Sequence, residues 1–472
     1  MIVQSLTLSA RNILRNRRRT VITLVAIVTG ALAILLFGGY ANSIVDGVQT
    51  GFVRQLGHLQ VQKQGYFLVG TGSPSDYGIA NYEEVARSIN ADPELRGMVK
   101  VVTPILQLHG IAGNFSASVS RTVAGIGVVP ADQNRLRQWN DYDFPGEIRP
   151  IALPENQDAA AVVGHGLART LRVCSAFSVP SCPKYDNQPE ASVSPGSPAT
   201  PEDLLALSAA VAENNTAAMP AEAGSHPTLE ILAATSTGAP NVASVPIVAA
   251  ESQGIKEVDD MFVALPLAVA QRLVYGNATP QATSLVVQLH HTDQIASASA
   301  RLKQLIEDNG WDLEVVDFRQ INATYDQIRG LFTSIFGFIA ILMGTIVLFS
   351  VANTMSMAVM ERTAEIGTVR SLGLCRGGVY EMFMIEGLLI GVLGAGLGTA
   401  VALSLAALIN SAGLTWIPPG QVDPIPLVIH VFNDPALIVG AFVGLVAVAA
   451  LSSLLPARRA ARMEVVDALR HV

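Results

Sequence analysis

Four long apolar stretches are the feature that most restricts how this chain can fold. They are residues 20–40, 331–352, 382–409 and 436–455, and Glu386 is the one charged residue within them. A helix rises about 1.5 Å per residue, so roughly 20 residues cross the ~30 Å hydrocarbon core of a bilayer. Half of the 472 residues are hydrophobic and only 14% are charged, which is unusual for a soluble protein. The sequence therefore predicts an α-helical membrane protein with four transmembrane helices.

The arginines flanking these stretches predict the orientation, because Lys and Arg near the ends of spans are retained in the cytoplasm. Arginines precede the first stretch, separate the second from the third and follow the fourth. The loop 411–435 contains neither Lys nor Arg. We therefore expect residues 1–19, as an interfacial helix, and the tail 456–472 to be cytoplasmic. Residues 41–330 and the loop 411–435 then lie outside.

The outer segment 41–330 is acidic, with 18 Lys and Arg against 30 Asp and Glu, and nothing in it indicates a nucleic-acid partner. Its patterns predict a large α+β domain containing a strand–helix–strand unit. The predicted elements are a helix at 81–90, a hairpin at 98–111 and 117–129, a strand at 284–289, a helix from 295 that ends at Asn309-Gly310 and a strand at 313–318. An insertion at about 154–256 holds 11 of the 25 prolines. We expect a split βαβ subdomain with an inserted second subdomain.

A short charged segment, residues 361–378, separates the second span, extended to 331–360, from the third. Ile366, Val369 and Leu372 recur at helical spacing and charged residues surround them, which predicts a short helix that buries one face. An ordinary helical loop explains the spacing equally well.

The sequence of this segment resembles a known family. Asn353-Thr354-Met355 and residues 361–373 are similar to the region after the second span in permeases of the FtsX-like, MacB and LolC/LolE type, with Ser371 where Ala is usual. The resemblance implies that this segment docks on an ABC ATPase as a coupling helix. The residues it assigns to docking are Glu361, Arg362, Glu365, Ile366, Gly367, Val369, Arg370, Leu372 and Gly373.

Small residues and cysteines suggest further contacts. The third span carries a glycine at every third or fourth position, which favours close helix packing: Gly387, Gly391, Gly394 and Gly398. Gly440 and Gly444 form a similar pair in the fourth span, and we expect Glu386 to cap a helix or pair with a cation. Cys174 and Cys182 lie in the outer segment, where they form a disulfide or remain two thiols; the sequence leaves both open.

Motifs for catalysis and metal binding are absent from the sequence. It has no phosphate loop of the Gly-x-x-x-x-Gly-Lys-[Ser/Thr] form, no Gly-x-Ser-x-Gly, no His-Glu-x-x-His and no Cys-x-x-Cys. The adjacent His290 and His291 point to opposite faces if they lie on a strand, so we expect them to be solvated and not to share a metal. We expect no cofactor and no enzymatic activity, with ATP hydrolysis in a partner subunit.

The resemblance implies the membrane subunit of a MacB/LolCDE-type ABC transporter in the inner (cytoplasmic) membrane. Its expected partners are a cytoplasmic ATPase, a second permease copy in a homo- or heterodimer, and a periplasmic adaptor or lipoprotein. It would export or release a lipoprotein, peptide or hydrophobic compound. The alternative is an FtsX-like signalling permease that regulates a cell-wall hydrolase without transport. The size of the outer segment favours the transporter.

Overall fold

The structure is a computed structural model that describes residues 17–145, 148–156, 158–183, 226–417 and 422–464. The predicted interfacial helix therefore lies outside the described residues up to residue 16, as do residues 184–225 of the insertion and the last eight residues of the tail. The chain divides into two compact units. The helical unit comprises Met1–Gly47, Thr324–Thr415 and Pro426–Val472, and the sheet unit comprises Val48–Ala323 and Trp416–Ile425.

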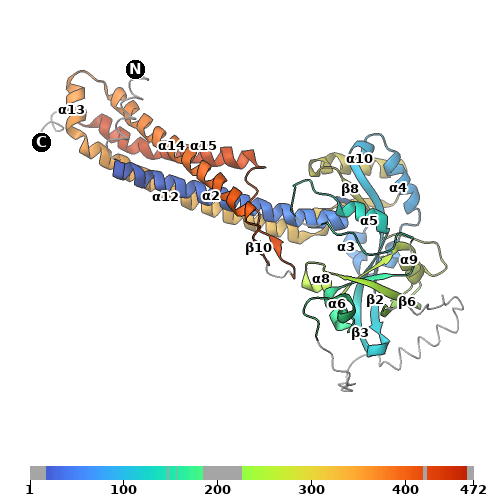
Figure 1. Cartoon of the computed structure of the whole chain (residues 1–472). Helices are drawn as coiled ribbons and strands as arrows, with labels where there is room; N and C mark the ends of the chain where they lie inside the picture. The colour runs from blue at the N-terminus through green and yellow to red at the C-terminus, as the bar shows by residue number, and fades with distance from the viewer. Residues whose placement is uncertain (1–16, 146–147, 157, 184–225, 418–421, 465–472) are drawn as a thin grey trace. The chain divides into compact units, whose positions relative to one another are not determined.

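Each predicted apolar stretch lies on one long helix (Figure 1). The four helices are α2 (Arg17–Leu56), α12 (Ala323–Glu361), α14 (Arg376–Ser411) and α15 (Pro435–Arg462). All four are long and apolar enough to cross a membrane. The 39 residues of α12 correspond to about 58 Å of helix, well beyond the ~30 Å of hydrocarbon. The helix α2 continues past residue 40 and α15 continues past Pro456, because a charge or a proline ends an apolar run without necessarily ending the helix.

The glycines of α14 lie where neighbouring helices approach closely. A Cβ placed on Gly391 would lie 2.8 Å from the Cβ of Ala449 on α15. On the next turns, a Cβ on Gly394 would lie 2.8 Å from the Cβ of Ile27 on α2, and one on Gly398 would lie 2.5 Å from that of Ala31. These distances are too short for any larger side chain, so the glycine stripe is a packing surface. Gly440 and Gly444 are different, since no described atom lies within 4 Å of a Cβ at either position.

The sheet unit begins with four antiparallel strands in the order β9-β1-β8-β2. They are β1 (Leu59–Lys63), β2 (Val99–Asn114), β8 (Ser284–Leu289) and β9 (Leu313–Asp317). Helix α4 (Tyr82–Ala91) connects β1 to β2, and α10 (Ile295–Asp308) connects β8 to β9. The sequence predicted these two helices, β2, β8 and β9 within a few residues of their observed bounds. The two β-α-β connections form a β-α-β-β-α-β arrangement split by the inserted strands.

An ion pair joins the two helices of this region. Arg301 on α10 donates to the carboxylate of Asp92 at 2.7 Å, and the amides of Glu94 and Leu95 donate to the same side chain. The guanidinium of Arg301 lowers the pKa of the Asp92 carboxyl. The pair therefore fixes the end of α4 against α10.

A second group of strands forms a closed ring of pairings, β2-β3-β7-β4-β6-β5, that returns to β2. The added strands are β3 (Val119–Val128), β4 (Ala161–Gly164), β5 (Thr228–Ala234), β6 (Pro240–Glu251) and β7 (Phe262–Pro266). The first half of β2 pairs with β8, and its second half pairs with β3 and β5. The inserted region is therefore wider than the predicted 154–256, since it starts within β2 and extends through α9 (Leu267–Tyr275).

The remaining elements are short. They are α3 (Tyr66–Val69), α5 (Pro130–Arg137), α6 (His165–Thr170), α8 (Lys256–Asp259), α11 (Phe318–Ile321), α13 (Thr363–Ser371), β10 (Thr415–Trp416) and β11 (Ile425–Pro426). Among the described residues, five 3₁₀ turns precede β8, and a sixth, η6 (Thr292–Gln294), precedes α10.

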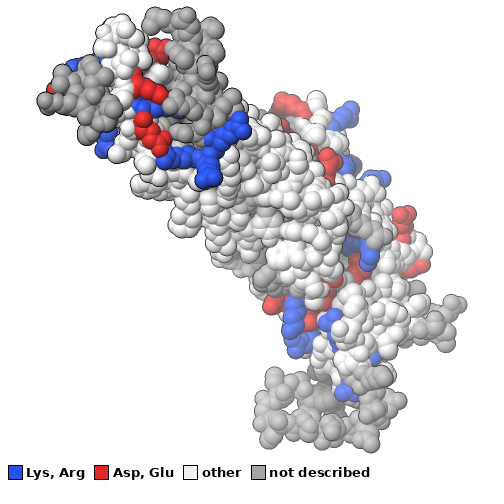
Figure 2. Space-filling view, turned by 60° about the vertical axis from the view of Figure 1, so that its left-hand side comes forward, with Lys and Arg blue, Asp and Glu red and all other residues white. Residues whose placement is uncertain are grey.

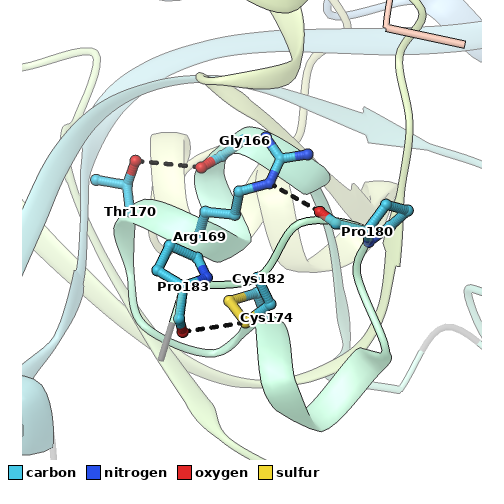
Figure 3. The surroundings of a disulfide bond; sticks show 7 residues. All are labelled: Gly166, Arg169, Thr170, Cys174, Pro180, Cys182 and Pro183. Atoms are coloured by element: carbon cyan, nitrogen blue, oxygen red, sulfur yellow. Dashed lines mark hydrogen bonds between the residues drawn. A yellow bond between two sulfur atoms is a disulfide. The ribbon is translucent and has the colours of Figure 1, made fainter. Parts of the chain in front are cut away.

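A disulfide joins Cys174 and Cys182, the bonded form of the two alternatives left open by the sequence (Figure 3). Cys174 is fully buried in the apolar cluster that underlies α6 and α9. Beside it, Arg169 Nε of α6 donates to the carbonyl of Pro180 within the loop that the disulfide closes, at 3.3 Å. The disulfide closes the loop, and this hydrogen bond holds the loop against α6.

Candidate functional site

Helix α13 lies between α12 and α14, inside the segment expected to dock on a partner. Its charges suit its ends, because Glu365 lies in the first turn and Arg370 in the last, where each opposes the helix dipole favourably. The chain turns after it at Gly373, whose φ of +104° few other residues adopt, and the Gly373 amide donates to the carbonyl of Arg370.

The apolar residues of α13 divide between two faces, which differs from the single docking stripe that the spacing suggested. Ile366 is only 3% exposed and belongs to the apolar core of the helical unit, and Gly367 is buried beside it. Val369 on α13 and Leu372, which caps its C-terminal end, are 44% and 82% exposed. Ile366 therefore cannot contact a partner in this conformation, and Val369 and Leu372 form the accessible apolar surface.

A buried ion pair anchors the start of α13. Arg362 Nη1 donates to Glu386 on α14 at 3.1 Å, and the two side chains are about 5% exposed. A charge is this deeply buried only when an opposite charge or several hydrogen bonds replace water. Of the two roles expected for Glu386, capping a helix or pairing with a cation, the structure shows the pairing.

Two more contacts hold this end of the helical unit. Glu361, at the end of α12, forms an ion pair with Arg19 of α2, and Arg370 donates to the backbone carbonyl of Met463 just after α15. One turn deeper, the hydroxyls of Thr23 and Thr354 share a hydrogen bond of 2.6 Å. Polar contacts thus connect α13 and its flanks to α2, α14 and the end of α15. Figure 2 shows a long uncharged surface with basic and acidic side chains gathered on either side of it.

The sequence named Arg362, Glu361 and Arg370 for docking, but the structure places all three in contacts within the chain. It missed Arg19 and assigned no partner to Glu386. The available signal was the isolated carboxylate in an apolar stretch, since such a group requires a cation nearby.

Within the described ranges, no three His, Cys, Asp or Glu residues are grouped to hold a metal. His291 is not simply solvated, because its Nδ1 lies 2.7 Å from Asp141, and this carboxylate raises the His291 pKa.

Comparison with known proteins identifies the part of the chain that contains this site. Residues 337–465 match the family described as FtsX-like permease C-terminal, and this range covers α13, α14, α15 and most of α12. The uncharacterized ABC transporter permease YknZ of Bacillus subtilis is 28% identical over 200 residues, 41% of this chain and 46% of its own length. The macrolide export ATP-binding/permease protein MacB of Nitrosomonas europaea is 30% identical over 222 residues, 46% of this chain and 30% of its own length.

The matched regions cover less than half of each of these relatives. A solved structure, the extracellular domain of YknZ, aligns with 55% of this chain and 98% of its own at 13% identity, with a TM-score of 0.29. That score is too low to establish a shared fold.

Proposed function

We propose that this chain, which contains an FtsX-like permease domain homologous to parts of MacB and YknZ, is the membrane subunit of an ABC transporter. A separate cytoplasmic ATPase supplies the energy, and the exposed face of α13 is its docking surface. The observation that carries the proposal is the division of α13. Val369 and Leu372 face outward within the matched family region, while Ile366 is fixed in the core.

The contacts of α13 explain how docking could act on the membrane helices. Arg362 connects the start of α13 to α14, and the preceding residue, Glu361, connects to α2. Displacing α13 therefore displaces these helix ends or breaks a buried ion pair, which is unfavourable. Movement of a docked ATPase is passed to the spans instead of being absorbed by a flexible loop.

The remaining parts of the proposal follow the family resemblance and the arginine distribution. The sheet unit lies outside the cytoplasmic membrane, and two permease copies form the transporter. Motion of the sheet unit exports or releases a lipoprotein, peptide or hydrophobic compound. A periplasmic adaptor or lipoprotein is a further partner. The loop 411–435, which contains neither Lys nor Arg, supports this orientation.

The test replaces exposed residues of α13 and measures the ATPase. The variants Val369→Asp and Leu372→Asp place a charge in the docking contact, where desolvation without a partner costs several kcal/mol. We expect each to reduce co-purification with the cognate ATPase by about tenfold or more, the effect of ~1.4 kcal/mol. Transport and permease-stimulated ATP hydrolysis should fall in parallel.

Gly377→Asp is the matched control. Gly377 is exposed and lies outside α13 at the start of α14, and no described atom lies within 4 Å of a Cβ placed there. The same charge should therefore leave ATPase binding unchanged at this position. Ile366→Asp should instead lower permease stability and yield. Full ATPase binding by both Val369→Asp and Leu372→Asp would show that α13 is not the docking surface.

A further inference from the structure

Strand β9 is the outer edge of the four-stranded region, and among the described residues it pairs only with β1. The amide of Phe318 donates to His58 and that of Gln64 donates to Asp312, so even-numbered residues of this segment direct their backbone groups toward β1. Backbone groups alternate in direction along a strand. The amide and carbonyl of Val315, and the carbonyl of Leu313, therefore point to the open edge.

A cavity of about 530 Å³ lies beside this edge, between β9 and α10. Its α10 wall is made of small residues at helical spacing, Ala296, Ser299 and Ala300, with Lys303 one turn further along. Val315 and Arg319 line the opposite side. The small side chains leave room for another backbone between the helix and the edge strand, a geometry that suits strand addition.

The charged groups of the cavity leave its cations available. Asp317 is occupied, because its carboxylate accepts the amide of Arg319 at 3.0 Å, and Asp293 lies at the η6 end of the cavity. Neither Lys303 nor Arg319 forms an ion pair with another described residue, although Arg319 stacks on the ring of Phe318. The Nε of Arg319 is buried without an acceptor in the described part of the chain. A buried N–H without a partner is unfavourable, so an acceptor from outside would be stabilising there.

We propose that this groove binds an extended polypeptide segment of a partner protein, which pairs with the edge of β9 and directs a carboxylate toward Lys303 and Arg319. The backbone edge supplies affinity for any extended chain, and the two cations select an acidic side chain. The groove lies wholly within the sheet unit. This inference goes beyond the proposed transport function and does not depend on it.

The direct test measures peptide binding to the full-length chain in lipid nanodiscs, without an ATPase. The probes are two fluorescein-labelled, end-blocked seven-residue peptides of alternating threonine and valine, with aspartate or lysine at the central position. Fluorescence anisotropy should show the aspartate peptide binding about tenfold more tightly than the lysine peptide, a difference of ~1.4 kcal/mol. The same aspartate peptide N-methylated on alternate amides should lose binding.

The variants separate backbone pairing from charge. Val315→Pro removes the outward amide but none of the bonds to β1, and proline is tolerated at a strand edge, so affinity for the aspartate peptide should fall about tenfold. Val315→Thr keeps the amide and should bind like the wild type. Lys303→Gln should reduce the preference for aspartate, whereas Gln304→Glu, which lowers the net charge equally but does not line the cavity, should preserve it.

Three outcomes would overturn the inference: no detectable binding of either peptide, equal binding by Val315→Pro and wild type, or no preference for aspartate. Because the readout is peptide affinity, this result does not depend on the outcome of the ATPase-docking test.

Discussion

At the scale of single residues, the buried ion pair of Arg362 and Glu386 predicts that removing one charge lowers stability more than removing both. Arg362→Met leaves the Glu386 carboxylate buried without its cation, which typically costs 3–5 kcal/mol. The double variant Arg362→Met with Glu386→Leu removes both charges, and its unfolding free energy should be close to that of the wild type. Denaturant unfolding in a fixed detergent measures the difference. Equal stability of the single and double variants would show that the pair is not buried as described.

His58 gives the sheet unit a dependence on pH. Its ring is fully buried and packs edge-to-face against Trp139 with the ring centroids 4.9 Å apart, and the amide of Leu289 donates to Nδ1. Burial lowers the pKa of His58 to about 3, against its ordinary 6.5. The unfolded chain therefore binds a proton as pH falls below 6.5 while the folded chain does not. The stability that His58 contributes is complete above pH 6.5 and is lost progressively down to about pH 3.

We therefore expect the free energy of unfolding to fall by about 2 kcal/mol between pH 6.5 and 5 on account of His58, at 1.36 kcal/mol per pH unit. His58→Asn keeps an acceptor for Leu289 but does not titrate, so it should be less stable overall and lose this slope. His291 titrates in both proteins and cancels from the comparison. Urea unfolding at the two pH values, followed by tryptophan fluorescence, is the measurement. A slope unchanged by the substitution would contradict the assignment.

At the scale of elements, α14 offers a comparison between neighbouring glycines. Gly394→Val and Gly398→Val force side chains into Ile27 and Ala31 of α2 and should each lower stability by about 1–3 kcal/mol through overpacking. Gly396→Val is the control, because no described atom lies within 4 Å of a Cβ there. In thermal unfolding in detergent, Gly396→Val should be as stable as the wild type or more stable, because valine has less conformational freedom than glycine in the unfolded chain. Equal losses at all three positions would mean that packing against α2 is not the cause.

The disulfide gives a second prediction for an element. Closing a loop of eight residues stabilises the folded state by about 2 to 3 kcal/mol in the chain-entropy model. Cys174→Ala combined with Cys182→Ala should lower the unfolding free energy by about that amount. Mass spectrometry of the exported, unreduced protein should find no alkylation at either cysteine, with Cys375 as the alkylated internal control. Two free thiols in that protein would refute the bond.

Some of the helices and strands could be predicted from sequence patterns alone. The long helices follow from apolar length alone, and β8, α10 and β9 follow from regular periodicity. The ring of strands was missed because β4 has four residues and its partners β6 and β7 come much later in the chain. The division of α13 was missed for a geometric reason. Residues three apart drift around a helix, so Ile366 and Leu372 point about 120° apart and cannot share one narrow face.

At the scale of the whole molecule, the orientation can be tested with single cysteines in a background without the native three. Cysteines at Ser118 and Gln304, both exposed in the sheet unit, should react with an impermeant thiol reagent in intact cells. One at Thr368, exposed on α13, should react only after the membrane is opened. Labelling of the Thr368 variant from outside would reverse the proposed topology.

The long strand β2 has a consequence for how this protein folds while the ribosome is still synthesising it. The second half of β2 belongs to the ring of strands, whose last member along the chain is β7, so the ring can close while the rest of the chain is still being made. The first half of β2 and all of β1 must wait for β8 and β9, which emerge just before α12. Until then these strand edges are open, and pairing between distant segments is slow. Until β8 and β9 emerge, nascent chains of this protein are therefore most prone to aggregation at β1. A chaperone that shields β1 would act before the second span is synthesised.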